Sequence, residues 1–343
     1  MANLFPFSIH HSPFSIQYSV FIERQMDGAL VIDKPSGLTS HDVVGRVRRA
    51  VGISRIGHTG TLDPLATGVL PLLVGRATRL APLLSGGLKR YDGLIRLGLE
   101  TDTYDITGRV IAREGLVSGD PRAGGERGAR LSTAAEAVDV DASGLDAARA
   151  AFVGTFRQQP PPFSAKKVGG VRAYRLARRR QPVRLDPVEV TVHDLTLTPA
   201  GPGRVRCRLT CSSGFYVRSL AHDLGQRLGT GGCLEALRRE WSDGFGLAQA
   251  VPLELVDAEG PVALARLIVL ADLLPDLPAL VLTARGAARV AHGCDLTPAD
   301  VVPAAAADAA RPLHIKLLDA RGTLLAIAER RPDRFLHPAI VLV

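Results

Sequence analysis

Residues 57–75 read GHTGTLDPLATGVLPLLVG, and this is the densest unusual segment of the chain. Its glycines and prolines favour a rigid loop between apolar elements. The loop presents four polar side chains, those of His58, Thr59, Thr61 and Asp63. The closing LPLLVG predicts a short buried strand. Taken alone, the Asp63-Pro64 dipeptide is most typical of a turn or a helix N-cap. A catalytic carboxylate is the less common alternative.

Strands and helices alternate on both sides of this segment. The apolar run GALVID, residues 28–33, predicts a strand, and Thr39 or Ser40 can cap a helix that Gly52 ends. The remaining patterns predict strands at about 91–99, 188–197 and 204–211, and helices at about 145–156, 217–228 and 234–240.

A length of 343 residues indicates two domains. We expect a catalytic domain over 26–273, interrupted by a Gly- and Arg-rich flexible insertion at 114–144, and a small β-rich domain over 276–343. Residues 1–25 hold four of the ten phenylalanines and differ in composition from the rest. We interpret Met26 as the start of the native chain; an organellar transit peptide is the alternative, although such peptides are usually richer in arginine.

The basic charge is carried by arginine. Lys+Arg number 42 against 34 for Asp+Glu, which gives a net charge of +8, and only five of the 42 are lysines. Guanidinium groups match phosphate oxygens and stack on bases, so this composition favours a polyanionic partner. A genome biased toward arginine and alanine codons would produce the same composition, and charge alone does not separate the two.

Two groups of residues resemble metal sites, but each lacks a feature that a metal site needs. Cys207 and Cys211 lie on one face of the alternating run RVRCRLTC, which favours buried apolar thiols. TDTYDITG resembles a calcium loop, but the twelfth position from Asp102 is Arg113 rather than glutamate. We therefore expect no metal, and we expect Asp105 to shape a pocket. No apolar run approaches the length of a membrane span. Four cysteines in a long chain without a secretory signal indicate reduced thiols, so we expect a cytoplasmic protein.

Five ordered motifs resemble the bacterial tRNA pseudouridine synthase B (TruB) family, whose members make pseudouridine at position 55 of tRNA. They span most of residues 27–240. They are GALVIDKPSGLTSHDVV, GHTGTLDPLATGVLPLLVGRATRL, KRYDGLIRLGLETDTYDITG, PPPFSAKKVGGVRAYRLAR and SSGFYVRSLAHDLG. The resemblance implies a mixed α/β (α+β) catalytic domain around a central, mostly antiparallel sheet, followed by a PUA-like RNA-binding domain.

The resemblance also implies the chemistry. The reaction breaks the N1–C1′ glycosidic bond, turns the uracil and rejoins it through C5, with no net redox change and hence no cofactor. It needs a carboxylate beside the anomeric carbon, and Asp63 matches that residue. Arg218 matches the arginine that pairs with it, Tyr91 the tyrosine that stacks on the flipped uracil, and Tyr216 a further aromatic of the site. Without the motifs, Arg218 and Tyr91 would be interpreted as a surface arginine and a strand tyrosine.

The tRNA T stem-loop is the implied partner, bound by a monomer without other proteins. His58 matches the histidine that enters the loop when the base is extruded. Lys34 and Arg79 match basic positions near the site and the RNA backbone, although solvated surface charges are a serious alternative for both. The basic segment around 166–180 suits an RNA clamp or, alternatively, a solvated helix. Its named candidates are Lys166, Lys167, Arg172 and Tyr174.

Three departures from the family pattern accompany the resemblance. Phe163 replaces the usual tyrosine, the 114–144 insertion is long, and the last domain matches only by position and strand content. Two rivals remain at this stage. One is a related synthase that works on guide RNAs inside a ribonucleoprotein, and the other is an RNA-binding protein without catalysis.

Overall fold

The computed structural model describes residues 27–113, 141–164, 166–168, 170–173, 185–303, 313–331 and 334–343. An 11-stranded, mostly antiparallel sheet forms the larger part of the molecule, with the main order β14-β1-β3-β12-β4-β11-β10-β7. The expected mixed α/β fold class is confirmed. The predicted extension at 1–25, most of the predicted insertion and Tyr174 lie outside the described residues, and from Ala142 onward the insertion's last residues form a helix.

The strands of the large sheet run as follows: β1 (Gly28–Lys34), β2 (Ile56–His58), β3 (Thr67–Val74), β4 (Lys89–Leu97), β7 (Gly154–Gln158), β10 (Val188–Pro199), β11 (Arg204–Cys211), β12 (Gly232–Ser242), β13 (Phe245–Gly246), β14 (Val251–Pro252) and β15 (Ile268–Val269). Two short hairpins stand apart from it. They are β5 (Leu99–Thr101) with β6 (Val110–Arg113), and β8 (Lys167–Val168) with β9 (Val171–Arg172).

Helix α2 (Ser40–Val51) forms where its local sequence predicts. Thr39 and Asp42 make a reciprocal capping box at its start, and Gly52 ends it in the left-handed conformation. Its buried valines pack on Leu30 and Ile32, which alternate along β1 with Ala29 and Val31. Helix α2 therefore covers one face of β1, and the residues on the other face are covered by different elements.

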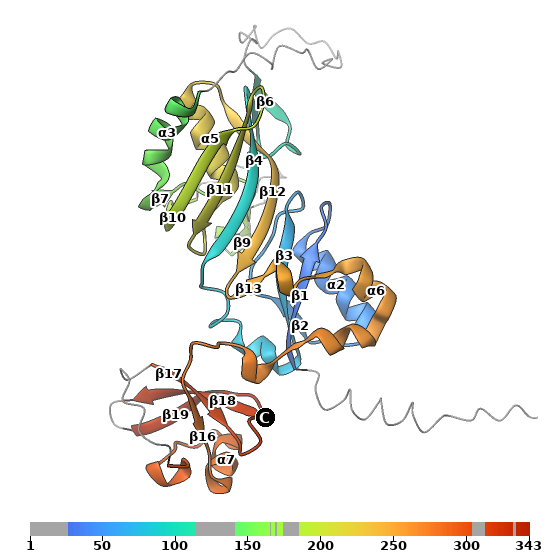
Figure 1. The fold of residues 1–343 in the computed structure, drawn as a ribbon, viewed down its shortest axis with the longest axis vertical. Helices are drawn as coiled ribbons and strands as arrows, with labels where there is room; N and C mark the ends of the chain where they lie inside the picture. The colour runs from blue at the N-terminus through green and yellow to red at the C-terminus, as the bar shows by residue number, and fades with distance from the viewer. Residues whose placement is uncertain are drawn as a thin grey trace, which may run out of the picture.

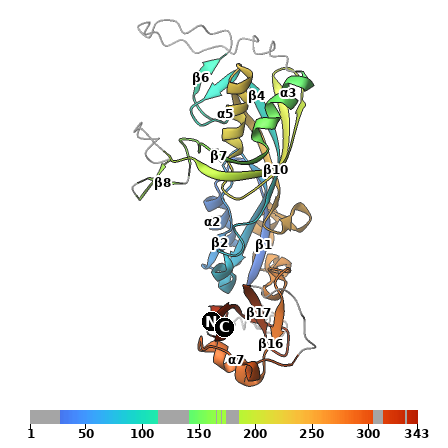
Figure 2. The ribbon, with the colours of Figure 1, turned by 90° about the vertical axis from the view of Figure 1, so that its left-hand side faces the viewer.

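Helix α5 (Val217–Leu228) packs against β12 and β4, and α3 (Ala142–Arg149) packs against β10. Figures 1 and 2 show both helices beside the half of the sheet formed by β4, β10 and β11. The predicted helix at 145–156 is correct only in its first part, because α3 gives way to the 3-10 turn η3 (Ala150–Phe152) and then to strand β7.

The predicted helix at 234–240 is wrong, because these residues belong to the long central strand β12. That strand pairs with β4 on one side and with β3 on the other. The pairing of β12 with β4 shifts register between Leu234 and Ala236. This irregularity interrupts the alternation of apolar and polar residues by which a strand is recognised in a sequence. The sheet's long-range pairing overrides the helical propensity of LEALRRE.

A second sheet, in the order β16-β17-β18-β19, forms a lobe at one end of the molecule (Figure 1). Its strands are β16 (Ala279–Val281), β17 (His314–Leu318), β18 (Leu324–Arg331) and β19 (Arg334–Val341), and α7 (Ala284–Ala291) lies with them. Leu324, Ile327 and Leu342 share a hydrophobic cluster with Leu73 and Leu80 of the large sheet region. The two parts thus bury apolar side chains against each other.

Three further short helical elements are η1 (Gly75–Leu80), α6 (Leu253–Glu259) and η5 (Gly260–Arg266), and the last two pack against α2. Further 3-10 turns are η4 (Leu247–Gln249), η6 (Leu270–Asp272) and η7 (Pro298–Asp300). No helix in the described part of the chain is both long and apolar enough to span a membrane.

Candidate active site

Asp63 stands on the loop between β2 and β3, and this loop is tied down on several sides. Leu62 exchanges hydrogen bonds with the buried Ser40 hydroxyl at 2.8 and 3.1 Å, and Gly37 N–H donates to the Pro64 carbonyl at 2.8 Å. The loop is therefore anchored to the start of α2. Because β3 follows, Asp63 does not cap a helix, and its carboxylate is held by an arginine instead.

Arg218, in the first turn of α5, forms a two-pronged ion pair with Asp63. Its Nε lies 2.8 Å from Oδ2 and its Nη2 lies 3.0 Å from Oδ1, across 155 residues of sequence. The arginine side chain is 6% exposed, whereas that of Asp63 is 37% exposed. The cation is thus buried behind a carboxylate that a ligand can reach from outside.

The other guanidinium protons of Arg218 bind backbone carbonyls. Nη1 donates to Thr103 O and Nη2 to Phe163 O, both at 2.9 Å. The buried Asp105 adds a second carboxylate 3.8 Å from Nε, and is itself held by the hydroxyls of Thr103 and Thr107. The sequence predicts that Asp105 shapes a pocket; in the structure its carboxylate lies beside Arg218.

Lys34 lies beneath the same loop. Its side chain is fully buried, and its ammonium donates to Pro35 O at 2.8 Å, Leu38 O at 2.7 Å and Pro64 O at 3.3 Å. Burial lowers the pKa of Lys34 to about 8, while the charge of Asp63 opposes the shift. The resemblance predicts a place near the site and the RNA backbone for Lys34; in the structure its ammonium supports the Asp63 loop from inside the protein.

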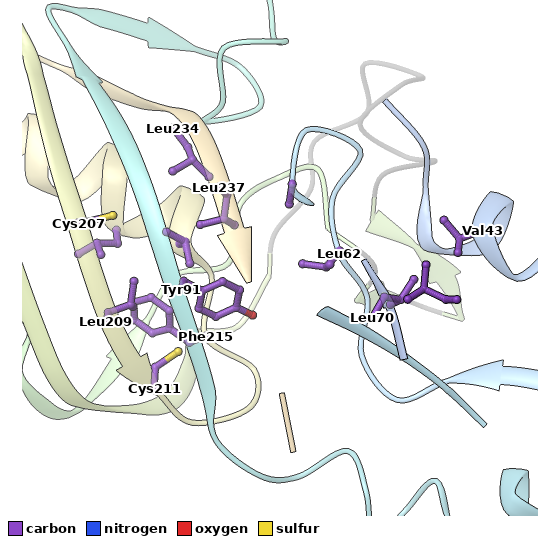
Figure 3. Packing of buried hydrophobic residues seen from close by; sticks show 14 of the residues in the cluster. Val43, Leu62, Leu70, Tyr91, Cys207, Leu209, Cys211, Phe215, Leu234 and Leu237 are labelled. Atoms are coloured by element: carbon purple, nitrogen blue, oxygen red, sulfur yellow. The ribbon is translucent and has the colours of Figure 1, made fainter. Parts of the chain in front are cut away.

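Tyr91, on β4, directs its hydroxyl toward the loop that carries Leu62 (Figure 3). Burial raises the pKa of this phenol, although the neighbouring Arg239 cation opposes the shift. Tyr216 immediately precedes α5, and the side-chain amide of Gln158 binds both its backbone N–H and its carbonyl. Burial raises the pKa of Tyr216 as well, so both phenols are neutral at physiological pH.

The remaining candidates from the sequence are His58, Arg79 and the basic residues near the β8–β9 hairpin. His58 is half-buried on β2, five residues before Asp63. Arg79 lies elsewhere: it is exposed on η1, and its Nη1 donates to the carbonyl of Val341 in the C-terminal lobe. Lys166 is half-buried beside the β8–β9 hairpin, which holds Lys167 and Arg172. The structure does not bring Arg79 to the site.

One buried cation of this region was missed at the sequence level. Arg239, on β12, donates to carbonyls of the Asp63 loop and of β3. In the sequence Arg239 is one of two adjacent arginines in a segment that was interpreted as a helix. On such a helix both arginines would be expected to face solvent.

The arrangement offers a carboxylate for nucleophilic or general-base chemistry at an electron-poor carbon. No group of three His, Cys, Asp or Glu side chains that could hold a metal ion occurs in the described residues. Cys207 and Cys211 are buried on β11, and burial raises the pKa of each thiol to about 12, as expected for apolar cysteines.

Comparison with known proteins identifies similar sequences over almost the whole chain. A family model described as TruB family pseudouridylate synthase (N terminal domain) matches residues 48–123 and 120–217. A protein named tRNA pseudouridine synthase B from Solibacter usitatus is 41% identical over 320 residues, 92% of this chain and 100% of the relative. Another of that name from Thermobifida fusca is 43% identical, over 79% of this chain and 87% of the relative.

Two solved structures share the fold at low sequence identity. The crystal structure of a Cbf5-Nop10-Gar1 complex matches with a TM-score of 0.65 and 22% identity, covering 94% of this chain and 87% of that chain. The structure of an H/ACA RNP bound to a substrate RNA containing 2′-deoxyuridine matches with a TM-score of 0.63 and 21% identity, with the same coverages.

Proposed function

The chain belongs to the TruB family of pseudouridylate synthases, and we propose that Asp63 is the carboxylate with which it converts uridine 55 in the T loop of tRNA to pseudouridine. The observation that carries the assignment is the Asp63–Arg218 ion pair, with its cation buried and its carboxylate accessible. An arginine that meets two carboxylate oxygens and two carbonyls leaves the carboxylate little freedom to turn.

In the proposed reaction the N1–C1′ bond breaks, C5 bonds to C1′, the proton on C5 leaves and N1 takes up one proton, so that product and substrate are isomers. Asp63 attacks C1′ or C6, or removes the 2′ proton to give a glycal; all three routes need an ionised carboxylate at this place. Arg218 keeps that carboxylate charged and oriented. The reaction has no net redox change and activates no leaving group, so it requires no cofactor and no metal.

The target base must leave the tRNA T loop to reach Asp63, because the T loop is folded and holds the base inside. We assign His58 to the space that the base vacates and the ring of Tyr91 to stacking on the extruded uracil. We also assign the Tyr91 hydroxyl to proton transfer at C5; because the phenol is neutral, it must give up its own proton as it takes the one from C5. Tyr216, held at the start of α5, completes the aromatic wall of the site.

We assign residues 26–273 to catalysis and residues 276–343 to RNA binding in a PUA-like domain. The β8–β9 hairpin with Lys166, Lys167 and Arg172 is the proposed clamp on the stem. The enzyme acts as a monomer on tRNA in the cytoplasm, without partner proteins. The relatives named tRNA pseudouridine synthase B match along most of their own length, which supports this over a guide-RNA enzyme.

The test is incubation of the purified protein with an unmodified T stem-loop, followed by chemical mapping of pseudouridine. A stem-loop with cytidine at the target position controls for modification elsewhere. We expect one pseudouridine per RNA in excess chelator and without nucleotide. Tight binding without any pseudouridine would instead support the RNA-binding rival.

A further inference from the structure

Arg239 is the largest of the fully buried side chains, with 1% exposure. It has no carboxylate within ion-pair distance in the part of the chain that the structure describes. Two other buried cations nearby do have one: Arg218 pairs with Asp63, and Lys89 with Asp243 at 2.7 Å. Burying a charge without a counter-ion costs free energy unless several dipoles solvate it. The contacts of the Arg239 guanidinium must therefore offset this cost.

The guanidinium of Arg239 is solvated by carbonyl oxygens that belong to the Asp63 loop and to β3. Nε donates to Val69 O at 2.8 Å, Nη2 to Gly60 O at 3.2 Å and Nη1 to Thr61 O at 3.4 Å. Thr61 is two residues before Asp63. The arginine therefore holds the backbone that leads directly into the catalytic carboxylate.

Tyr91 is the neighbour of Arg239 in the sheet. Arg239 on β12 is the direct cross-strand partner of Tyr91 on β4, so the two side chains lie on the same face, and the positive charge of Arg239 opposes the rise in the pKa of the phenol. On its other side, β12 lies close to β3: a Cβ at Gly68 would be 2.2 Å from the carbonyl oxygen of Arg239. The backbone of Arg239 thus has a fixed place between the strands, and its guanidinium bonds the Asp63 loop on the same face of the sheet as Tyr91.

We propose that Arg239 is a positioning residue for pseudouridine formation, whose guanidinium fork holds the Asp63 loop at a fixed distance from β12 and from Tyr91, the neighbour of Arg239 on β4. The inference rests on the function proposed above. A lysine cannot replace it, because a single ammonium offers a point charge and not a planar fork that bonds several acceptors at fixed angles. Arg239 acts through Asp63 and Tyr91 and does not need to touch the RNA.

The test compares Arg239→Lys and Arg239→Gln with the matched control Arg238→Lys. Arg238 is the preceding residue on β12, but its side chain is 40% exposed and pairs with Asp33 at 2.7 Å. Single-turnover rates are measured at saturating T stem-loop, together with the RNA Kd. Misplacement of reacting groups by about 1 Å costs about 100-fold in rate, so we expect a fall of roughly 30- to 100-fold for both Arg239 variants.

Binding and structure are followed separately. We expect the Kd of the Arg239 variants to stay within about 3-fold of wild type, because phosphate contacts supply most of the affinity. Incorporation of 3-fluorotyrosine labels the five tyrosines for ¹⁹F NMR, and Tyr91→Phe assigns the Tyr91 signal. That signal should move in both Arg239 variants and stay in place in Arg238→Lys.

The outcomes separate failure of the proposed function from failure of the positioning role of Arg239. A wild-type protein that makes no pseudouridine refutes the proposed function and is seen before any variant is compared. An active wild type with an equally active Arg239→Lys overturns only the positioning role. A loss of rate without movement of the Tyr91 signal also overturns it, as does loss of folding in both Arg239 variants, because the arginine would then serve the fold as a whole.

Discussion

Replacement of Asp63 by asparagine removes the proposed nucleophile and keeps nearly the same shape. One oxygen still accepts a hydrogen bond from Arg218, but the new amide NH₂ faces the other guanidinium N–H and cannot accept. Loss of a nucleophile from a catalytic unit costs about 10⁴-fold or more in rate. We therefore expect Asp63→Asn to form no measurable pseudouridine, while its affinity for tRNA stays within a few-fold of wild type.

The effect on stability follows from the contacts of Arg218. Breaking a buried ion pair costs about 3–5 kcal/mol, but here Asp63 is 37% exposed and Arg218 keeps its bonds to Thr103 O and Phe163 O. Partial exposure screens the pair, so we expect a loss of about 2 kcal/mol. At about 2.1 cal/mol/K of unfolding entropy per residue, that loss lowers the Tm of a 343-residue chain by roughly 3 °C, so the variant stays folded at 25 °C.

The assay is single-turnover release of tritium from C5 of uridine in a T stem-loop, with RNA binding and thermal melting measured on the same samples. Asp92→Asn is the control, because Asp92 also meets an arginine with both oxygens, at 2.8 Å from Arg206 Nε and 2.6 Å from Nη2. It lies next to Tyr91 on β4 but on the opposite face of the sheet. It should retain activity.

Arg218→Ala should also lose most activity, because it leaves the carboxylate without its cation. The double variant should be scarcely slower than Asp63→Asn, since residues that act as one unit lose activity non-additively. Turnover by Asp63→Asn within about 10-fold of wild type, with deamidation of the introduced asparagine ruled out by mass spectrometry, would refute the assignment of the carboxylate.

Three further predictions follow from charge and domain structure. Deletion of residues 277–343 should weaken tRNA binding more than the chemical step, and single-turnover rates at saturating RNA check this; it should also lower the Tm, because Leu324 and Ile327 leave their shared cluster. Binding should weaken steeply with salt and turnover should persist in excess chelator, since counter-ion release accompanies phosphate contacts; metal-dependent turnover would contradict this. The pKa of Lys34 falls from 10.5 to about 8 on folding, so the unfolded chain holds this proton between those pH values and the folded protein does not. Stability should therefore gain from this group as pH rises from about 8 to 10.5. Lys34→Met should remove that gain in denaturant titrations at pH 7.5 and 10, and an unchanged pH slope would show that the lysine keeps its proton.

Local signals in the sequence were sufficient for several elements. The helix at Ser40–Val51 was predicted because its cap, its apolar face and its terminal glycine are all contained within the segment. The strands β10 and β11 were predicted from their strict alternation. The motifs also singled out Asp63 and Arg218, whose ion pair the structure contains. Nothing in the structure tests their catalytic roles, which remain predictions.

The failures fall where distant contacts outweigh local preference. Residues 234–240 look helical, yet they form the centre of β12 because β3 and β4 supply hydrogen-bond partners on both sides. Lys34 and Arg79 are both basic residues of the motifs that resemble the family, and the sequence alone does not distinguish their surroundings. Folding buries Lys34 among three carbonyls and places Arg79 against the C-terminal lobe.

The sequence by itself determined the family and the fold class, and it singled out Asp63 as the candidate carboxylate, since these follow from residue types in a fixed order. Only the tertiary structure decided how that carboxylate is held. Asp63 and Arg218 are 155 residues apart, and the carbonyls that bind Arg218 and Arg239 carry no side-chain signature at all. A backbone carbonyl is present in every residue, so only the path of the folded chain selects which ones meet a guanidinium.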